Sequence, residues 1–121
     1  MMNISDAEAR VMAVLWASAP LSSGQVVACL SNEENWSPKT IRTLLDRLHA
    51  KGALARELPD RVYLYRPLIS HQQWLQTQAT ALVETHFNGR LAPLVSAFAS
   101  SQPLSDRDRE EILAILEGKN A

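Results

Sequence analysis

The stretch from Trp36 to Gly52 constrains this chain more than any other, because it has the features of one helix with a defined start and end. Ser37 is a good N-cap, and Pro38 suits the first helical position, where its missing N–H is not needed and its φ is already helical. Gly52 supplies the left-handed residue that commonly follows a helix. The sequence therefore predicts a helix over residues 38–51.

The two faces of this predicted helix differ in chemistry. An apolar stripe follows the i, i+3, i+4, i+7 spacing of a core-facing helix: Ile41, Leu44, Leu45 and Leu48. The opposite face carries basic and hydroxyl side chains, and with the cap it gives the candidate DNA contacts Ser37, Lys39, Thr40, Arg42, Thr43 and Arg47. Arginine can donate two parallel hydrogen bonds to guanine, threonine can contact a thymine methyl or a phosphate, and lysine can neutralise a phosphate. Such a face suits a DNA major groove; a solvated helix face is the alternative.

The segment before this helix predicts two further helices. Ser5 and Glu8 have the spacing of a capping box, and the apolar pattern that follows ends near Pro20. Ser22 or Ser23 then caps a second, short helix. The organising helix thus comes third.

Beyond Gly52 the pattern changes towards strands. Residues 53–58 are short and mixed, Pro59-Asp60 favours a turn, and residues 61–66 are β-favouring, which predicts a two-stranded hairpin. Three helices and a hairpin define a winged helix-turn-helix, in which the third helix enters the major groove and the hairpin tip reaches the flanking backbone. Arg61 at the tip is a candidate phosphate or minor-groove contact, with a solvated turn as the alternative.

From Ser70 onward the sequence shows helical patterns and no strand signal. Asn88-Gly89 ends the first helix, Pro93 fits the first turn of the second, and Ser105 caps the third. Three short amphipathic helices are too few for an independent core, so we expect their apolar stripes to pack against a second copy of the chain. Packing back on the winged helix as one monomeric domain is the alternative. The candidate dimerisation residues are Trp74, Leu75, Leu82, Leu91, Leu94, Val95, Phe98, Ile112 and Leu116.

Length and composition fit this organisation. We expect a mainly α fold with a small β-hairpin, in which a winged-helix DNA-binding domain spans residues 1–68 and a helical dimerisation domain spans residues 69–121. The chain is 46% apolar and 21% charged, an ordinary globular balance. No apolar run approaches the roughly 18 residues of a membrane span, and residues 1–6 lack signal-peptide features, so we expect a cytoplasmic protein.

The net charge of −1 is unevenly distributed. Residues 36–66 hold seven basic and three acidic side chains, a surplus of four positive charges, whereas residues 69–121 hold four basic and six acidic ones. This asymmetry predicts a nucleic-acid-binding half and a non-binding half.

Other classes of function find less support. The histidines are separated and the carboxylates form no convergent motif, so we expect neither an enzyme nor a cofactor site. His71 and His86 with Glu84 are an alternative metal-ligand set, although exposed helical histidines are commoner. Cys29 is the only cysteine, which excludes an intrachain disulfide, and we expect a buried thiol. A winged helix used for protein contacts is the main rival; it would have an apolar outer face on the third helix.

The run WSPKTIRTL at residues 36–44, together with the first-helix pattern from Ile4 to Trp16, resembles the penicillinase-repressor family, also called BlaI/MecI/CopY. The similarity covers nearly the whole chain. It implies a homodimeric transcriptional repressor of dyad-symmetric operators, which in the better-known members lie at β-lactamase and methicillin-resistance genes. By the same resemblance, the residues that match operator-contacting positions are Lys39, Thr40, Arg42 and Thr43.

Two features depart from the family's patterns. The copper-responsive branch carries paired Cys-x-Cys motifs near the C-terminus, whereas this chain has only Cys29, so a thiolate metal sensor is not expected. In the antibiotic-responsive branch a membrane-bound sensor protease triggers cleavage of an Asn-Phe bond, and the matching pair here is Ala97-Phe98. Half of that site is missing, which makes the sensor protease the least supported of the expected partners.

Overall fold

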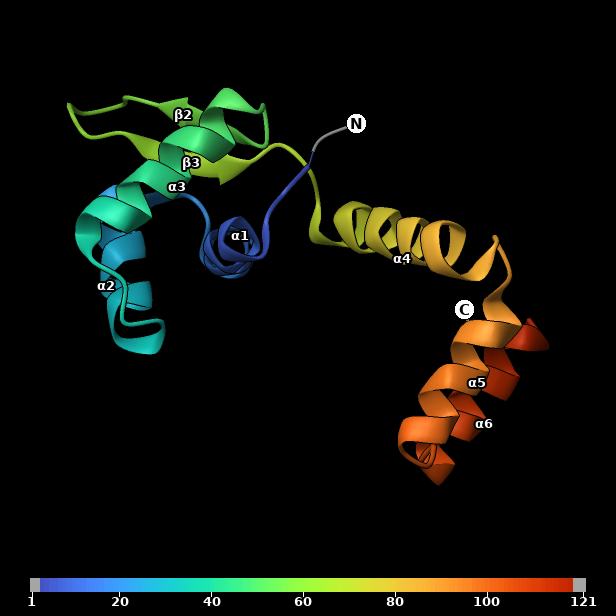
Figure 1. Ribbon diagram of the computed structural model, residues 1–121. Helices are drawn as coiled ribbons and strands as arrows, with labels where there is room; N and C mark the ends of the chain where they lie inside the picture. The colour runs from blue at the N-terminus through green and yellow to red at the C-terminus, as the bar shows by residue number, and fades with distance from the viewer. Residues whose placement is uncertain (1–2, 119–121) are drawn as a thin grey trace. The chain divides into compact units, whose positions relative to one another are not determined.

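The computed structural model describes residues 3–118, so residues 1, 2 and 119–121 of the two expected domains lie outside the described part. The chain divides into an N-terminal unit that ends at Leu75 and a C-terminal unit that starts at Gln76. The elements, labelled in Figure 1, are α1 (Asp6–Ser18), β1 (Leu21–Ser22), α2 (Ser23–Glu33), α3 (Pro38–Ala50), β2 (Leu54–Glu57), β3 (Leu64–Pro67), α4 (His71–Phe87), α5 (Leu91–Ser101) and α6 (Asp106–Leu116). The predicted class, mainly helical with a small antiparallel sheet, is confirmed.

The first three helices begin at their predicted caps. Ser5 Oγ accepts a hydrogen bond from Glu8 N at 3.1 Å, and Glu8 Oε1 accepts one from Ser5 N at 2.8 Å, which closes the capping box of α1. Ser22 caps α2 in the same way, and Ser37 caps α3. Gly52 follows α3 with a φ of 82°, the left-handed conformation that the sequence predicts there.

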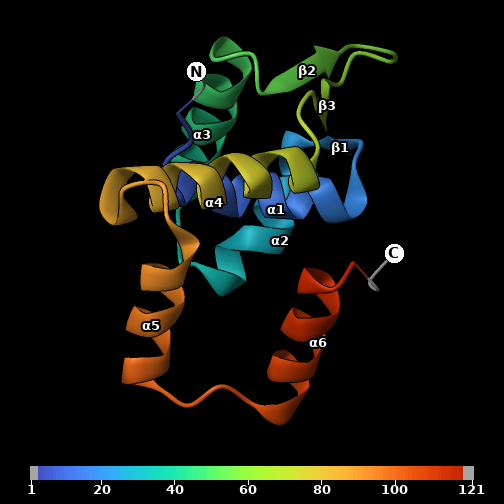
Figure 2. The same cartoon turned by 90° about the vertical axis from the view of Figure 1, so that its right-hand side faces the viewer.

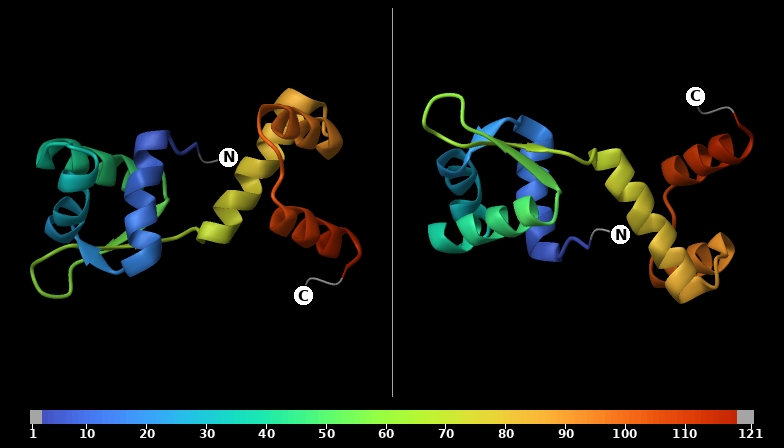
Figure 3. Two further views of the ribbon diagram at one scale, coloured as in Figure 1. Left: turned by 90° about the horizontal axis from the view of Figure 1, so that it is seen from below. Right: turned by 90° about the horizontal axis from the view of Figure 1, so that it is seen from above.

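The sheet has three strands, in the order β1-β3-β2, where the sequence predicts two (Figure 2). β1 pairs antiparallel with β3, and it escaped prediction because a strand of two residues has no periodicity of its own. β2 and β3 form the expected hairpin, but residues 58–63 connect them, a longer loop than a turn at Pro59-Asp60. We call this loop the wing; Figure 3 shows it extending beyond the helices of the N-terminal unit.

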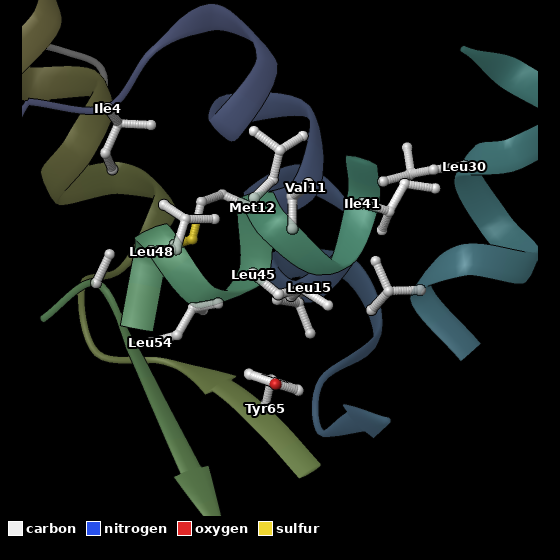
Figure 4. Packing of buried hydrophobic residues seen from close by; sticks show 13 residues of the cluster. Ile4, Val11, Met12, Leu15, Leu30, Ile41, Leu45, Leu48, Leu54 and Tyr65 are labelled. Carbon is white, nitrogen blue, oxygen red and sulfur yellow. The ribbon is translucent and has the colours of Figure 1, made fainter. Parts of the chain in front are cut away.

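The core of the N-terminal unit forms around the predicted stripe of α3, as Figure 4 shows. All four stripe residues are buried, and they pack against α1, α2 and the sheet; the side chains they meet include Val11, Met12, Leu15, Val26, Leu30, Leu54 and Tyr65. Burial of one such aliphatic side chain stabilises a fold by about 1.5–3 kcal/mol. The prediction for Cys29 is wrong: its thiol is exposed, because α2 buries only the narrow stripe of Val26 and Leu30.

The start of α4 packs on the N-terminal unit. Trp16 Nε1 donates a hydrogen bond to the carbonyl oxygen of Ile69 at 2.9 Å, and the His71 ring stacks on Trp16 with 4.5 Å between ring centroids. The ring centroid of Trp74 lies 5.4 Å from that of Trp16, and Trp74 also packs against the core. With these contacts the N-terminal unit extends to Leu75, beyond the domain boundary that the sequence places after residue 68. Trp74, which the sequence places among the dimerisation candidates, therefore packs within its own chain.

The C-terminal unit contains most of α4 together with α5 and α6, and Figure 2 shows the extended connection that joins α5 to α6. Asn88 and Gly89 end α4 with φ values of 55° and 75°, and Ser105 caps α6, as predicted. In the described part of these three helices no side chain is fully buried. None of the helices described in the chain is both long enough and apolar enough to cross a bilayer.

An ion pair ties the end of α3 to the start of α1. Glu8 is charged yet only 2% exposed, and its Oε1 accepts a hydrogen bond from Lys51 Nζ at 2.5 Å. Lys51 also donates to the carbonyl oxygen of Asn3 at 2.8 Å. Burial acts to raise the pKa of Glu8, but the hydrogen bond from Lys51 and those involving Ser5 together outweigh it, so the pKa lies below its ordinary value of 4.5.

Lys51→Met should destabilise the protein near neutral pH, because it leaves the buried charge of Glu8 without its partner; the cost should lie below the roughly 3–5 kcal/mol of a fully buried pair, since the Lys51 side chain is 37% exposed. In the wild type the stabilisation from this pair is fully present above pH 4.5, the ordinary pKa of the carboxyl group. It is lost as the pH falls through the lower pKa that Glu8 has in the folded protein. In the variant burial raises the pKa of Glu8, so acid neutralises the unpaired charge. Urea unfolding should therefore show the wild-type advantage shrinking as the pH falls from about 7 to about 4.

Glu8→Gln is the matched control, because it keeps an acceptor for the Ser5 N–H but has no charge to bury. It should cost less than Lys51→Met at neutral pH. An advantage of wild type over Lys51→Met that stays constant with pH would contradict the role of this pair.

Candidate DNA interface

The outer face of α3 is fully available to solvent. Burial of the apolar stripe turns the opposite side of the helix outward, so every candidate contact that the sequence places there is exposed: Ser37, Lys39, Thr40, Arg42, Thr43 and Arg47. Five residues of α3 line one shallow hollow on this face, namely Lys39, Thr40, Thr43, Leu44 and Arg47. The structure thus brings the predicted residues of this helix together on one surface.

The hydroxyl groups at the start of α3 hold one another. Ser37 Oγ accepts a hydrogen bond from Thr40 N at 3.2 Å and lies 3.0 Å from Thr40 Oγ1. Ser37 therefore serves first as the helix cap, with Thr40 fixed beside it. The free N–H groups of this first turn and the positive end of the helix dipole favour a phosphate nearby.

Thr43 uses its hydroxyl hydrogen within its own helix. Its Oγ1 donates to the carbonyl oxygen of Lys39 at 2.9 Å. The side chain keeps its methyl group and the acceptor lone pairs of Oγ1 for an outside partner. A thymine methyl or an amino group of adenine or cytosine fits these requirements, whereas a phosphate, which needs a donor, does not.

Ion pairs within the chain neutralise some of the basic side chains of residues 36–66 and leave the remaining positive charge on α3 and the wing. Three of the seven basic side chains have carboxylate partners: Lys51 pairs with Glu8, Arg56 with Asp46 at 3.6 Å, and Arg66 with Glu57 at 2.8 Å. In the described part of the chain the other four have no ion-pair partner, and they are Lys39, Arg42, Arg47 and Arg61. Three of these lie on α3 and one on the wing, where the sequence predicts DNA contacts.

Arg61 lies on the exposed wing, in the predicted hairpin connection. Its φ is 63°, a left-handed conformation that costs a side-chain-bearing residue about 1–2 kcal/mol. Its neighbours Leu58, Val62 and Tyr63 are also exposed. The wing thus presents one guanidinium without an ion-pair partner in the described chain, on a loop that also exposes apolar side chains.

The sequence did not reveal the partner of Asp46. Asp46 lies one turn beyond Arg42 on α3, and an interaction between these two residues is the natural expectation from spacing. In the structure it instead pairs with Arg56 of β2. The pairing of Asp46 with Arg56 could not be predicted from helical spacing, because it depends on how the hairpin packs beside α3.

Residues 4–118 match the family model described as penicillinase repressor. The chain belongs to the penicillinase repressor family. The penicillinase repressor of Bacillus licheniformis is 37% identical over 115 residues, which cover 95% of this chain and 90% of that protein. The methicillin resistance regulatory protein MecI of Staphylococcus aureus is 30% identical over 117 residues, which cover 97% and 95%. The resemblance that the sequence motifs indicate is confirmed.

Solved structures from this family match the winged helix. The solution structure of the DNA-binding domain of the repressor BlaI has a TM-score of 0.55 and 43% identity, over 60% of this chain and 88% of that one. The monomeric form of Bacillus licheniformis BlaI, in complex with the blaP half-operator, has a TM-score of 0.53 and 44% identity, over 59% and 87%. The winged-helix prediction for the N-terminal part is therefore confirmed.

Proposed function

We propose that this chain is a homodimeric transcriptional repressor that binds dyad-symmetric operator DNA through the outer face of α3 and the wing. The observation that carries the proposal is the separation of the two faces of α3: its leucine stripe is buried, and its unpaired cations face outward. The relative whose structure is titled as a complex with a half-operator supports DNA as the ligand. A repressor acts on chromosomal DNA, so the proposal includes a cytoplasmic location.

Each side chain on this face has a chemistry that suits one part of the duplex. Arg42 can donate two parallel hydrogen bonds to guanine, and no carboxylate of the described chain holds its guanidinium away. Lys39, a point charge at the start of the helix, suits a phosphate. Thr43 offers its methyl group to thymine. Ser37, Thr40, Arg47 and Arg61 then fix the register on the backbone.

The rival function, a winged helix used for protein contacts, has less support. A protein-binding surface of this kind needs an apolar patch, whereas the outer face of α3 is basic and hydroxylic. An enzymatic role also has little support, since the relatives are described as repressors and regulators.

Dimerisation is proposed for the C-terminal unit because its helices have apolar faces without a core. Leu94, Val95 and Phe98 of α5 meet Leu104 and Ile112 around a nearly apolar hollow of about 300 Å³. Other candidates are also exposed: Leu82, Leu91 and Leu116 of this unit, and Leu75 at the end of the N-terminal unit. A second copy of the chain would cover such surfaces in an isologous contact. Joining two recognition helices then makes the second half-site contact effectively intramolecular.

A sensor protease that cuts an Asn-Phe bond fits this chain poorly. The matching bond, Ala97–Phe98, lies inside α5, where the carbonyl oxygen of Phe98 accepts hydrogen bonds from Gln102 N at 3.1 Å and Ser101 Oγ at 2.8 Å. A protease that is specific for an Asn-Phe bond needs Asn before the bond, where this chain has Ala97. We therefore propose that release from DNA follows another route.

Arg42→Ala should cost about 1–3 kcal/mol on the operator and relax specificity at one base position, because a two-bond base contact is lost. Lys39→Ala should instead weaken binding to all sequences alike and reduce the salt slope by about one, since a phosphate contact is lost. Gel-shift titrations with DNA from just upstream of the protein's own gene, and with random DNA, measure both effects.

Arg107→Ala is the control for these two variants, since it removes the same charge from α6. Its binding to both DNAs should match the wild type. An equal loss on operator and random DNA in Arg42→Ala would show that Arg42 does not read a base.

Phe98→Ala should weaken the dimer and, through it, operator binding. Phe98 is 44% exposed in a single chain, so a second copy is expected to cover the exposed part of its ring. Truncating a fully buried phenylalanine costs about 3–5 kcal/mol, so the loss of this partial contact should cost the dimer less than that. Sedimentation of wild type and variant at several concentrations measures the change. Leu68→Ala, which truncates an exposed leucine of the N-terminal unit, should leave association unchanged.

Two results would oppose this role for Phe98. The variant could lose thermal stability and keep its oligomeric state, which would assign Phe98 to an intrachain core. Alternatively, a wild-type protein that stays monomeric at micromolar concentration without DNA would defeat the dimer proposal outright.

A further inference from the structure

Arg56 lies at the point where the recognition helix and the wing meet. It belongs to β2, directly opposite Tyr65 of β3 in the ladder, and its side chain is 28% exposed. Its Nη1 lies 3.6 Å from Asp46 Oδ1 on the outer face of α3. Its guanidinium carbon lies 4.4 Å from the ring centroid of Tyr63 in the wing. One side chain therefore contacts both proposed DNA-binding elements.

The ion pair with Asp46 and the stacking on Tyr63 both depend on the orientation of the Arg56 guanidinium. A planar guanidinium stacks on an aromatic face and presents its N–H groups at the edge, so a stacked arginine orients both its aromatic and its acidic neighbour. Hydrogen bonding with Tyr65 raises the pKa of Arg56 and outweighs the burial that lowers it, and the carboxylate of Asp46 acts in the same direction as the hydrogen bond. The guanidinium is therefore the cation that both contacts require. Arg56 thus links α3 to the wing through an ion pair at 3.6 Å and a contact with the Tyr63 ring.

The wing has little else to hold it. Residues 58–63 form a six-residue connection outside the ladder, and Leu58, Val62 and Tyr63 are exposed. Loops of this kind are more mobile than the elements they connect. Tyr63 lies two residues from Arg61, the unpaired cation of the wing, so a contact that fixes Tyr63 also restricts where Arg61 can reach.

We propose that Arg56 is a positioning residue that braces the wing against α3 and so sets the position of Arg61 over the DNA flanking the recognition helix. This inference rests on the proposed DNA-binding function. Arg56 acts through Asp46 and Tyr63 and makes no essential DNA contact itself. Asp46 then belongs to the interface as the anchor of the brace, separate from any interaction with Arg42.

The test compares two duplexes of the upstream DNA that the wild type binds: a long one that includes the flanks under the wing, and a short one trimmed to the base pairs under α3. Tyr63→Leu removes the ring and changes no charge, so it should weaken binding to the long duplex by about two- to fivefold, the range of an exposed cation–π contact, and leave the short duplex unaffected. Tyr63→Phe keeps the ring and should match the wild type on both.

Arg56→Lys is the second variant, because it keeps the charge and loses the planar fork. It should behave like Tyr63→Leu. In an Arg61→Ala background neither Tyr63→Leu nor Arg56→Lys should have any further effect, since the brace acts through Arg61. Thermal unfolding of each variant checks that the fold is intact before DNA is added.

Three outcomes would overturn the brace. Tyr63→Leu could bind the long duplex as tightly as wild type. Arg56→Lys could be silent while Arg56→Ala weakens both duplexes alike, which would make Arg56 a plain phosphate contact. The effects of Tyr63→Leu and Arg61→Ala could also simply add. Failure of the wild type to bind either duplex would instead contradict the proposed function itself.

Discussion

The burial of the α3 leucine stripe is the interaction on which the rest of the structure depends. Ile41, Leu44, Leu45 and Leu48 fix the rotation of α3 about its axis, because any other rotation would expose them to water. The same rotation sets Lys39 and the rest of the outer face towards solvent. Core packing and recognition are therefore two consequences of one sequence pattern.

Ion pairs within the chain then determine which of the basic side chains remain available for DNA. Lys51 is committed to Glu8 inside the fold, and Arg56 is committed to Asp46 and the Tyr63 ring. Among the basic side chains of residues 36–66, those that remain without ion-pair partners in the described chain are those of the proposed interface. A small local surplus of charge can serve DNA binding in this way, because it is concentrated on one helix face and one loop rather than spread over the surface.

The sequence predicted the helices and the orientation of α3 well, since caps and apolar periodicity are local signals. Ser5, Ser22 and Ser37 begin their helices as their spacing indicates. What it could not predict depends on contacts between distant segments: the two-residue strand β1, the pairing of Asp46 with Arg56, and the packing of Trp74 on Trp16. The exposure of Cys29 was missed because residue type was a poorer guide than its position beside the buried stripe of α2.

The outer face of α3 is proposed to read a particular DNA sequence. The most direct test is a fluorescence anisotropy titration of the wild-type chain against labelled upstream DNA and against a scrambled duplex of the same length and composition, at one near-physiological salt concentration. Binding to the upstream duplex should be tighter than binding to the scrambled duplex by on the order of a thousandfold or more. Equal affinity for the two duplexes would contradict it, because an unspecific basic surface would then explain all of the binding.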